Sequence, residues 1–266
     1  MPSTERDGVR LFWTEQGSGE PLLLIMGLGA THVWWHRLTP IVASRFRTIL
    51  FDNRGVGDSG PSPRPFSIAD MADDAMAVLD AAHVESAHVF GASMGGMIAQ
   101  EVVLRHPKRV RSLILGCTAC GGRDVVPADR EVREALNARG TMTREESTWK
   151  MVPYTFDAGT PRERIEEDIA IRLAATVPNE GFFAQFDAIR SWEGTLSRLP
   201  TIATPTLVIH GETDALVPPE NGRIIARAIP NAKLVMLPNA SHIFYTDQTD
   251  ASADAIMSFL GQQVTA

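Results

Sequence analysis

Residues 91–96 read Gly-Ala-Ser-Met-Gly-Gly and join a short apolar run at residues 87–90 to a helix-like stretch that ends before Pro107. This is a Gly-x-Ser-x-Gly pattern between a predicted strand and a predicted helix. A serine on such a strained turn directs its hydroxyl away from the sheet, and glycines flank it because a Cβ there would collide with neighbouring backbone. We therefore interpret Ser93 as a nucleophile; a glycine-rich connection with an idle serine is the alternative.

Runs that are apolar at nearly every position recur on both sides of this turn. Continuous apolarity over so few residues is typical of strands covered on both faces, as in a parallel sheet. These runs occupy residues 22–26, 48–51, 87–90, 113–115, 206–209 and 234–237, and residues 8–17 add an alternating strand pattern that closes in a glycine turn.

Helical patterns separate these predicted strands. The clearest spans residues 67–82, where Ser67 and Asp70 supply a capping-box-like start. Others follow Met94, cover residues 219–229 and end the chain. Strands that alternate with helices predict an α/β fold with a doubly wound sheet.

Residues 121–199 interrupt the alternation, since helix-like segments rich in aromatic residues occur there without an apolar strand run. We expect a helical cap inserted into one α/β core that is formed by residues 1–120 and 200–266. Most of its aromatic side chains can simply pack on the core, but some are expected to face whatever lies beneath the cap.

Composition limits the class of partner. The chain has 266 residues and a net charge of -7, with acidic and basic residues mixed along it. No nucleic-acid or membrane surface is implied. The amino terminus lacks the apolar core of a signal peptide, so we expect a soluble, cytoplasmic protein. The two cysteines, Cys117 and Cys120, are interpreted as small packing residues near a strand end rather than as a redox pair.

A serine nucleophile requires a base, and the base requires a group that fixes its tautomer. Asp214 follows the predicted strand at residues 206–209, and His242 follows the one at residues 234–237. The carboxyl ends of parallel strands share one edge of a sheet, so Ser93, Asp214 and His242 are predicted to converge there. Glu212 is the rival acid, interpreted as a solvated loop residue.

The other histidines are assigned to packing. His210 belongs to a strand and is expected to support the acid loop, whereas His83, His88 and His106 occupy helix ends or strand bodies. His32 and His36 have the i, i+4 spacing of a zinc pair, but no third ligand is evident. We therefore predict neither a metal nor a cofactor.

An oxyanion needs backbone N–H donors. Met94 N–H follows the nucleophile at a helix start, and Leu28 N–H lies in the glycine loop after residues 22–26. That loop and Asp52 also imitate a dinucleotide fingerprint, but His32 replaces its third glycine. Residues 57–61, Gly-Asp-Ser-Gly-Pro, imitate a protease serine motif and are interpreted as a turn.

Four segments together resemble the α/β-hydrolase family over essentially the whole chain. They are residues 91–96, residues 51–59 (Phe-Asp-Asn-Arg-Gly-Val-Gly-Asp-Ser), residues 210–214 (His-Gly-Glu-Thr-Asp) and residues 241–242 (Ser-His). The resemblance implies a mostly parallel eight-stranded sheet with a helical cap inserted after the sixth strand. It also implies Ser93 as nucleophile, His242 as base and Asp214 as acid.

The serine at position 93 disfavours the reactions of relatives that use an aspartate nucleophile, and the sequence is similar to the branch of carboxylesterases and enol-lactonases. We expect hydrolysis of a small-molecule ester or lactone with an apolar portion. Three alternatives stay open: a carbon–carbon hydrolase of ring-cleavage products, a cofactor-free perhydrolase and a non-catalytic receptor. Ile243 stands where the carbon–carbon hydrolases tend to carry tryptophan. The substrate and the oligomeric state do not follow from the sequence.

Overall fold

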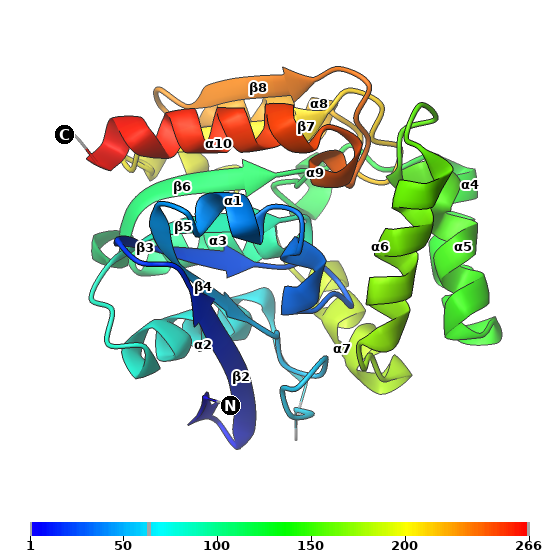
Figure 1. Ribbon diagram of the computed structural model, residues 1–266, viewed down its shortest axis with the longest axis horizontal. Coiled ribbons are helices and arrows are strands. Elements are labelled where there is room, and N and C mark those ends of the chain that lie inside the picture. The colour runs from blue at the N-terminus through cyan, green and yellow to red at the C-terminus, as the bar shows by residue number, and fades with distance from the viewer. Residues whose placement is uncertain (1, 63–64, 265–266) are drawn as a thin grey trace.

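The computed structural model describes residues 2–62 and 65–264, and these residues form one eight-stranded sheet (Figure 1). The strand order is β1-β2-β4-β3-β5-β6-β7-β8. The first two strands are antiparallel to their neighbours and the rest are parallel, which confirms the predicted fold class. The strands are β1 (Ser3–Arg6), β2 (Val9–Gln16), β3 (Glu20–Ile25), β4 (Phe46–Phe51), β5 (Ala87–Ala92), β6 (Val110–Gly116), β7 (Thr206–Gly211) and β8 (Lys233–Leu237).

Helices cover both faces of the sheet. On one face lie α2 (Ile68–Ala81), α3 (Met94–Arg105) and α8 (Glu220–Ala228), and on the other α1 (Thr39–Val42), α9 (Phe244–Asp247) and α10 (Thr249–Val264). Single-turn 3-10 helices occur at η1 (His32–Trp35), η2 (Pro107–Arg109), η3 (Gly122–Asp124), η4 (Ala138–Thr141) and η5 (Leu199–Thr201). None of the helices in residues 2–62 and 65–264 combines the length and apolarity that a membrane span requires.

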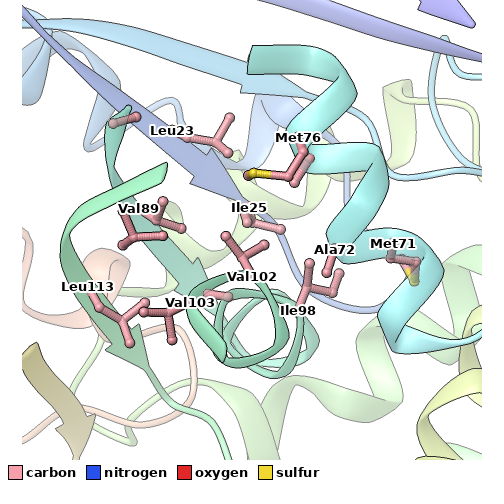
Figure 2. Close-up of a cluster of buried hydrophobic side chains, with 14 of the residues drawn as sticks. Leu23, Ile25, Met71, Ala72, Met76, Val89, Ile98, Val102, Val103 and Leu113 are labelled. Atoms are coloured by element: carbon pink, nitrogen blue, oxygen red, sulfur yellow. The ribbon is translucent and has the colours of Figure 1, made fainter. Parts of the chain in front are cut away.

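Strand β3 shows why its sequence is apolar without interruption. Leu23 and Ile25 pack into the cluster beneath α2 and α3, which Figure 2 shows, while Leu22 and Leu24 pack into the cluster on the opposite face. All four side chains are at most 1% exposed. Because both faces are covered, no polar alternation survives in a central strand.

Four helices lie between β6 and β7, in the interval where the sequence shows no strand pattern. They are α4 (Arg130–Asn137), α5 (Arg144–Thr155), α6 (Arg162–Ala174) and α7 (Asn179–Arg190). Figure 1 shows them beyond the arrowheads of the parallel strands. The chain leaves the core and returns to it at neighbouring positions, where Thr195 N–H donates to Cys120 O at 2.8 Å.

Candidate active site

Ser93 lies on the turn between β5 and α3, with a strained backbone of φ 58° and ψ -122°. A Cβ at Gly91 would lie 2.0 Å from Gly95 O, and one at Gly95 would lie 2.1 Å from Ile25 O, so both flanking positions require glycine. Although Ser93 is the N-cap of α3, its side chain makes no capping bond. The hydroxyl is therefore available to a partner outside the helix.

That partner is His242. Its Nε2 lies 3.0 Å from Ser93 Oγ, and its Nδ1 lies 2.8 Å from Asp214 Oδ2. A carboxylate only accepts, so Nδ1 carries the proton and Nε2 presents a lone pair to the serine hydroxyl. The structure thus brings the three predicted side chains into one hydrogen-bonded row, at the carboxyl edge of the sheet.

Asp214 is held by the loop that carries it. Its Oδ1 accepts from Leu216 N–H at 3.0 Å and from Val217 N–H at 2.8 Å, which leaves Oδ2 for His242. His210 Nε2 donates to Val217 O at 2.8 Å and lies 3.2 Å from Asp214 Oδ2, which confirms that His210 supports the acid loop.

The pKa of Asp214 is lowered despite its complete burial. Burial alone would raise it, but electrostatic attraction to the imidazoles of His242 and His210, together with the hydrogen bonds from both rings, outweighs that effect. The carboxylate is therefore ionised at neutral pH. The rival acid Glu212 is exposed to solvent.

The two predicted oxyanion donors both border the same cavity as Ser93 and His242. Within the described part of the chain, neither Leu28 N–H nor Met94 N–H has an acceptor. Met94 N–H also lies at the amino terminus of α3, where the helix dipole favours negative charge.

The residues that imitate a dinucleotide site, a protease serine and a zinc pair have structural contacts instead. Asp52 is fully buried and accepts from His32 N–H at 2.7 Å and from Asp58 N–H at 2.9 Å, so it braces loops and is closed to a ribose. Ser59 Oγ donates to Asp52 O at 2.6 Å, as expected of a turn. His32 and His36 approach different carboxylates, Asp52 and Asp168, and do not form a pair.

A cavity of about 260 Å³ opens above Ser93. Its walls come from the sheet edge and from the helices between β6 and β7, and most of them are apolar. Side chains that line it include Leu28, Trp34, Met97, Leu136, Met151, Phe182, Phe186, Ile189, Leu216 and Ile243. A space of this size and character suits a small, largely apolar molecule.

Comparison with known proteins assigns the family. A family model described as alpha/beta hydrolase fold matches residues 20–142, and one described as TAP-like protein matches residues 190–264. The chain is 31% identical to "Putative carbamate hydrolase RutD" of Azorhizobium caulinodans, over 98% of this chain and 99% of that protein. The chain belongs to the α/β-hydrolase family.

Solved α/β-hydrolase structures support the same assignment. The enol-lactonase of Burkholderia xenovorans LB400 is 26% identical, with a TM-score of 0.86 over 98% of this chain and 100% of that one. A thermophilic esterase of Thermogutta terrifontis is 28% identical, with a TM-score of 0.83 over 98% and 97%. Their names describe different activities on one fold, and the likeness to them supports the family assignment.

Gln185 is a residue of this α/β-hydrolase that no sequence motif indicated. It lies on α7 and is fully buried. Its Oε1 accepts from Gly29 N–H at 2.8 Å, and its Nε2 donates to Arg54 O at 2.9 Å. Gly29 directly follows Leu28, so one amide from the inserted helices fixes the loop that presents Leu28 N–H.

We expect the Gln185→Met variant to lose about 10-fold in kcat, because the Leu28 loop is no longer held against the oxyanion. The two polar groups left unpaired, Gly29 N–H and Arg54 O, should also lower the free energy of unfolding by about 2 to 4 kcal/mol. Steady-state kinetics and urea unfolding measure the two effects. Asp187→Asn, an exposed change on the same helix, is the control. A destabilised variant with unchanged kcat would assign Gln185 to stability alone.

Asp247 connects the loop of His242 to the inserted helices. Its carboxylate accepts from Ser241 N–H at 2.7 Å, from Asp157 N–H at 3.2 Å and from the Thr160 hydroxyl at 2.6 Å. Burial raises the pKa of Asp247 from 3.8 to about 6. The hydrogen bonds oppose this rise, and repulsion from Asp157 adds to it.

Stability should therefore depend on pH through Asp247. The pKa is higher in the folded than in the unfolded chain, so the folded state binds the proton more tightly. The resulting stabilisation is complete below about pH 4 and is lost as the pH rises through 6, a change of about 3 kcal/mol. The free energy of unfolding of Asp247→Asn, relative to wild type, should rise by about 2 to 3 kcal/mol between pH 3.5 and pH 7. Urea titrations at both pH values measure this difference, and the exposed Asp250→Asn variant is the control. The same pH dependence of the free energy of unfolding in wild type and Asp247→Asn would contradict the prediction.

Proposed function

We propose that this α/β-hydrolase cleaves a carboxylic ester or lactone through an acyl-enzyme on Ser93. The observation that carries the proposal is the hydrogen-bonded row from Ser93 Oγ through His242 to Asp214, at the floor of a mostly apolar cavity. An imidazole whose Nδ1 is bound to a carboxylate and whose Nε2 lies 3.0 Å from a serine hydroxyl is arranged to remove the proton of that hydroxyl.

In the first half-reaction, Ser93 Oγ attacks the carbonyl carbon while its proton moves to His242 Nε2. The carbonyl oxygen becomes an oxyanion and accepts from Leu28 N–H and Met94 N–H. Asp214 stabilises the imidazolium that forms. The tetrahedral intermediate then expels the alkoxide, which takes the proton from Nε2. For an ester the alcohol leaves, and for a lactone it stays attached to the acyl chain.

In the second half-reaction, water occupies the place of the alcohol. His242 Nε2 removes a proton from this water as it attacks the acyl carbon, and the Ser93 oxygen is expelled and reprotonated by Nε2. The products are a carboxylic acid and the original enzyme. Carbon–carbon hydrolysis and perhydrolysis would use the same serine and histidine, so an ester, lactone, diketone and peracid panel separates these reactions.

The proposal is tested with a fluorophosphonate probe, which phosphonylates only an activated serine. Wild-type protein should react with one equivalent of the probe, and peptide mapping should find the adduct on Ser93. The Ser59→Ala variant is a matched control, because Ser59 also lies in a Gly-x-Ser-Gly turn. This variant should still be labelled, whereas Ser93→Ala should not. A labelled Ser93→Ala variant or an unreactive wild type would overturn the proposal.

A further inference from the structure

Arg139 is a cation in the wall of the substrate cavity, and no carboxylate of residues 2–62 and 65–264 forms an ion pair with it. It lies on η4, between α4 and α5, and its guanidinium stacks over the Phe182 ring at 3.9 Å from the centroid. Its Nε is buried without a hydrogen-bond partner. Across the described residues, the Arg139 side chain forms no hydrogen bond or ion pair with any group.

The two neighbouring arginines are partnered, in contrast. Arg144 donates to the carbonyl oxygens of Arg172, Leu173 and Ala175, at the end of α6. Arg172, which also borders the cavity, stacks over Trp34 at 4.2 Å and lies 3.4 Å from Asp168 Oδ2. Of these three arginines, Arg139 is the one whose N–H donors are not used by the described residues and can bind another molecule.

The charged side chains that line the cavity also favour binding of an anion. Among the described residues that line it, two are arginines and none is an aspartate or glutamate. Burial, and then repulsion from Arg144, lower the pKa of Arg139 to about 10, so it remains charged at neutral pH. A half-buried cation without a partner is costly to maintain, and an anion that enters the cavity would relieve that cost.

Arg139 also lies near the reaction centre. The ring on which it stacks, Phe182, packs against the Leu28 loop so closely that a Cβ at Gly29 would meet Phe182 Cδ2 at 2.5 Å. The guanidinium is therefore one aromatic ring away from the loop that carries the predicted oxyanion donor. Arg139 and Ser93 also line the same cavity of about 260 Å³, so one molecule bound there can contact both.

We propose that Arg139 binds a carboxylate of the substrate, so that the preferred ester or lactone carries a free carboxylate in addition to its apolar portion. The inference rests on the proposed function of Ser93. A guanidinium fork matches a carboxylate with two parallel hydrogen bonds. The Phe182 ring supports the guanidinium from one side, with its centroid 3.9 Å from Arg139 Cζ.

The test compares pairs of esters in which one member carries a carboxylate where the other carries a methyl group. The pair 4-nitrophenyl hydrogen adipate and 4-nitrophenyl hexanoate places the carboxylate on the acyl side, and the pair butyryl glycolate and ethyl butyrate places it on the alcohol side. Wild-type kcat/KM should favour the charged member of at least one pair by about 10-fold or more. Arg139→Met should reduce that preference by about 10- to 100-fold, and Arg139→Lys should retain part of it.

The exposed Arg133→Met on α4 is the matched control and should keep the wild-type preference. Equal losses on charged and neutral esters in Arg139→Met would overturn the proposal, because they would indicate packing against Phe182 alone. Equal wild-type rates within both pairs would overturn it as well. In those cases hydrolysis of the neutral esters and probe labelling of Ser93 would leave the proposed function standing.

A binding measurement is independent of catalysis. Adipate should raise the Tm of the wild type and of Ser93→Ala but not that of Arg139→Met, and the neutral hexanamide should not discriminate between them. An equal rise of Tm with adipate in Arg139→Met would overturn the carboxylate site. Failure of every ester and of the probe, with the adipate effect intact, would overturn the proposed function and leave the carboxylate site in place.

Discussion

The Ser93→Ala variant should hydrolyse an activated ester about 10⁶-fold more slowly than the wild type. Without the hydroxyl, His242 Nε2 has no proton to remove and no acyl-enzyme can form. The remaining rate reflects only binding and the N–H donors of Leu28 and Met94. Pre-steady-state kinetics provide a second readout, because the burst of alcohol that accompanies acylation should vanish.

A loss of folding is separated from a loss of chemistry by a second variant. Because Ser93 has a φ of 58°, glycine suits its backbone better than alanine does. Ser93→Gly should therefore keep the wild-type Tm and be as inactive as Ser93→Ala. Hydrolysis that persists in both variants, with the fold intact by circular dichroism, would exclude Ser93 as the nucleophile.

The Asp214→Asn variant should lower kcat by about 10⁴-fold with little loss of structure. Leu216 N–H and Val217 N–H both donate to Oδ1, so the asparagine must keep its carbonyl oxygen there. Its NH₂ group then points at His242 Nδ1, which has to accept. The imidazole proton moves to Nε2, where it blocks the transfer from the serine hydroxyl.

This tautomer argument has its own signature. Nitrogen-labelled His242 should show Nδ1 protonated in the wild type and Nε2 protonated in Asp214→Asn by NMR. Glu212→Gln, two residues away and exposed, is the control and should leave both kcat and the tautomer unchanged. An active Asp214→Asn variant would mean that another carboxylate orients the histidine.

Most of the sheet could be predicted, because burial on two faces leaves a direct trace in the sequence. Runs such as Leu22–Ile25 are apolar at every position since both side-chain directions meet covering helices. Strand β1 (Ser3–Arg6) leaves no such trace. It is polar and half exposed, pairs only with β2 at the edge of the sheet, and is held there by backbone hydrogen bonds that any side chain permits.

Some residues of the candidate site could be predicted from the sequence and others could not. Ser93, Asp214 and His242 follow strand ends, and a parallel sheet places all strand ends on one edge, so local patterns sufficed to bring them together. Gln185 and Arg139 are different. Gln185 is distinguished by hydrogen bonds to distant segments, and Arg139 by a buried Nε that has no hydrogen-bond partner. The spacing of residues along the sequence does not indicate contacts between distant segments.

The hydrogen bond between Thr195 N–H and Cys120 O gives the inserted helices a single narrow neck. A segment that leaves and rejoins a scaffold at neighbouring atoms can be exchanged for another of different length without stretching the scaffold. Chimeras of this protein and its relatives are therefore best joined at this neck. The transplanted helices need their own substitutes for Gln185 and Thr160, because the side chains of these two residues bind Gly29 N–H and the Asp247 carboxylate at the candidate site. Substrate range and chemical machinery could then be recombined as separate modules.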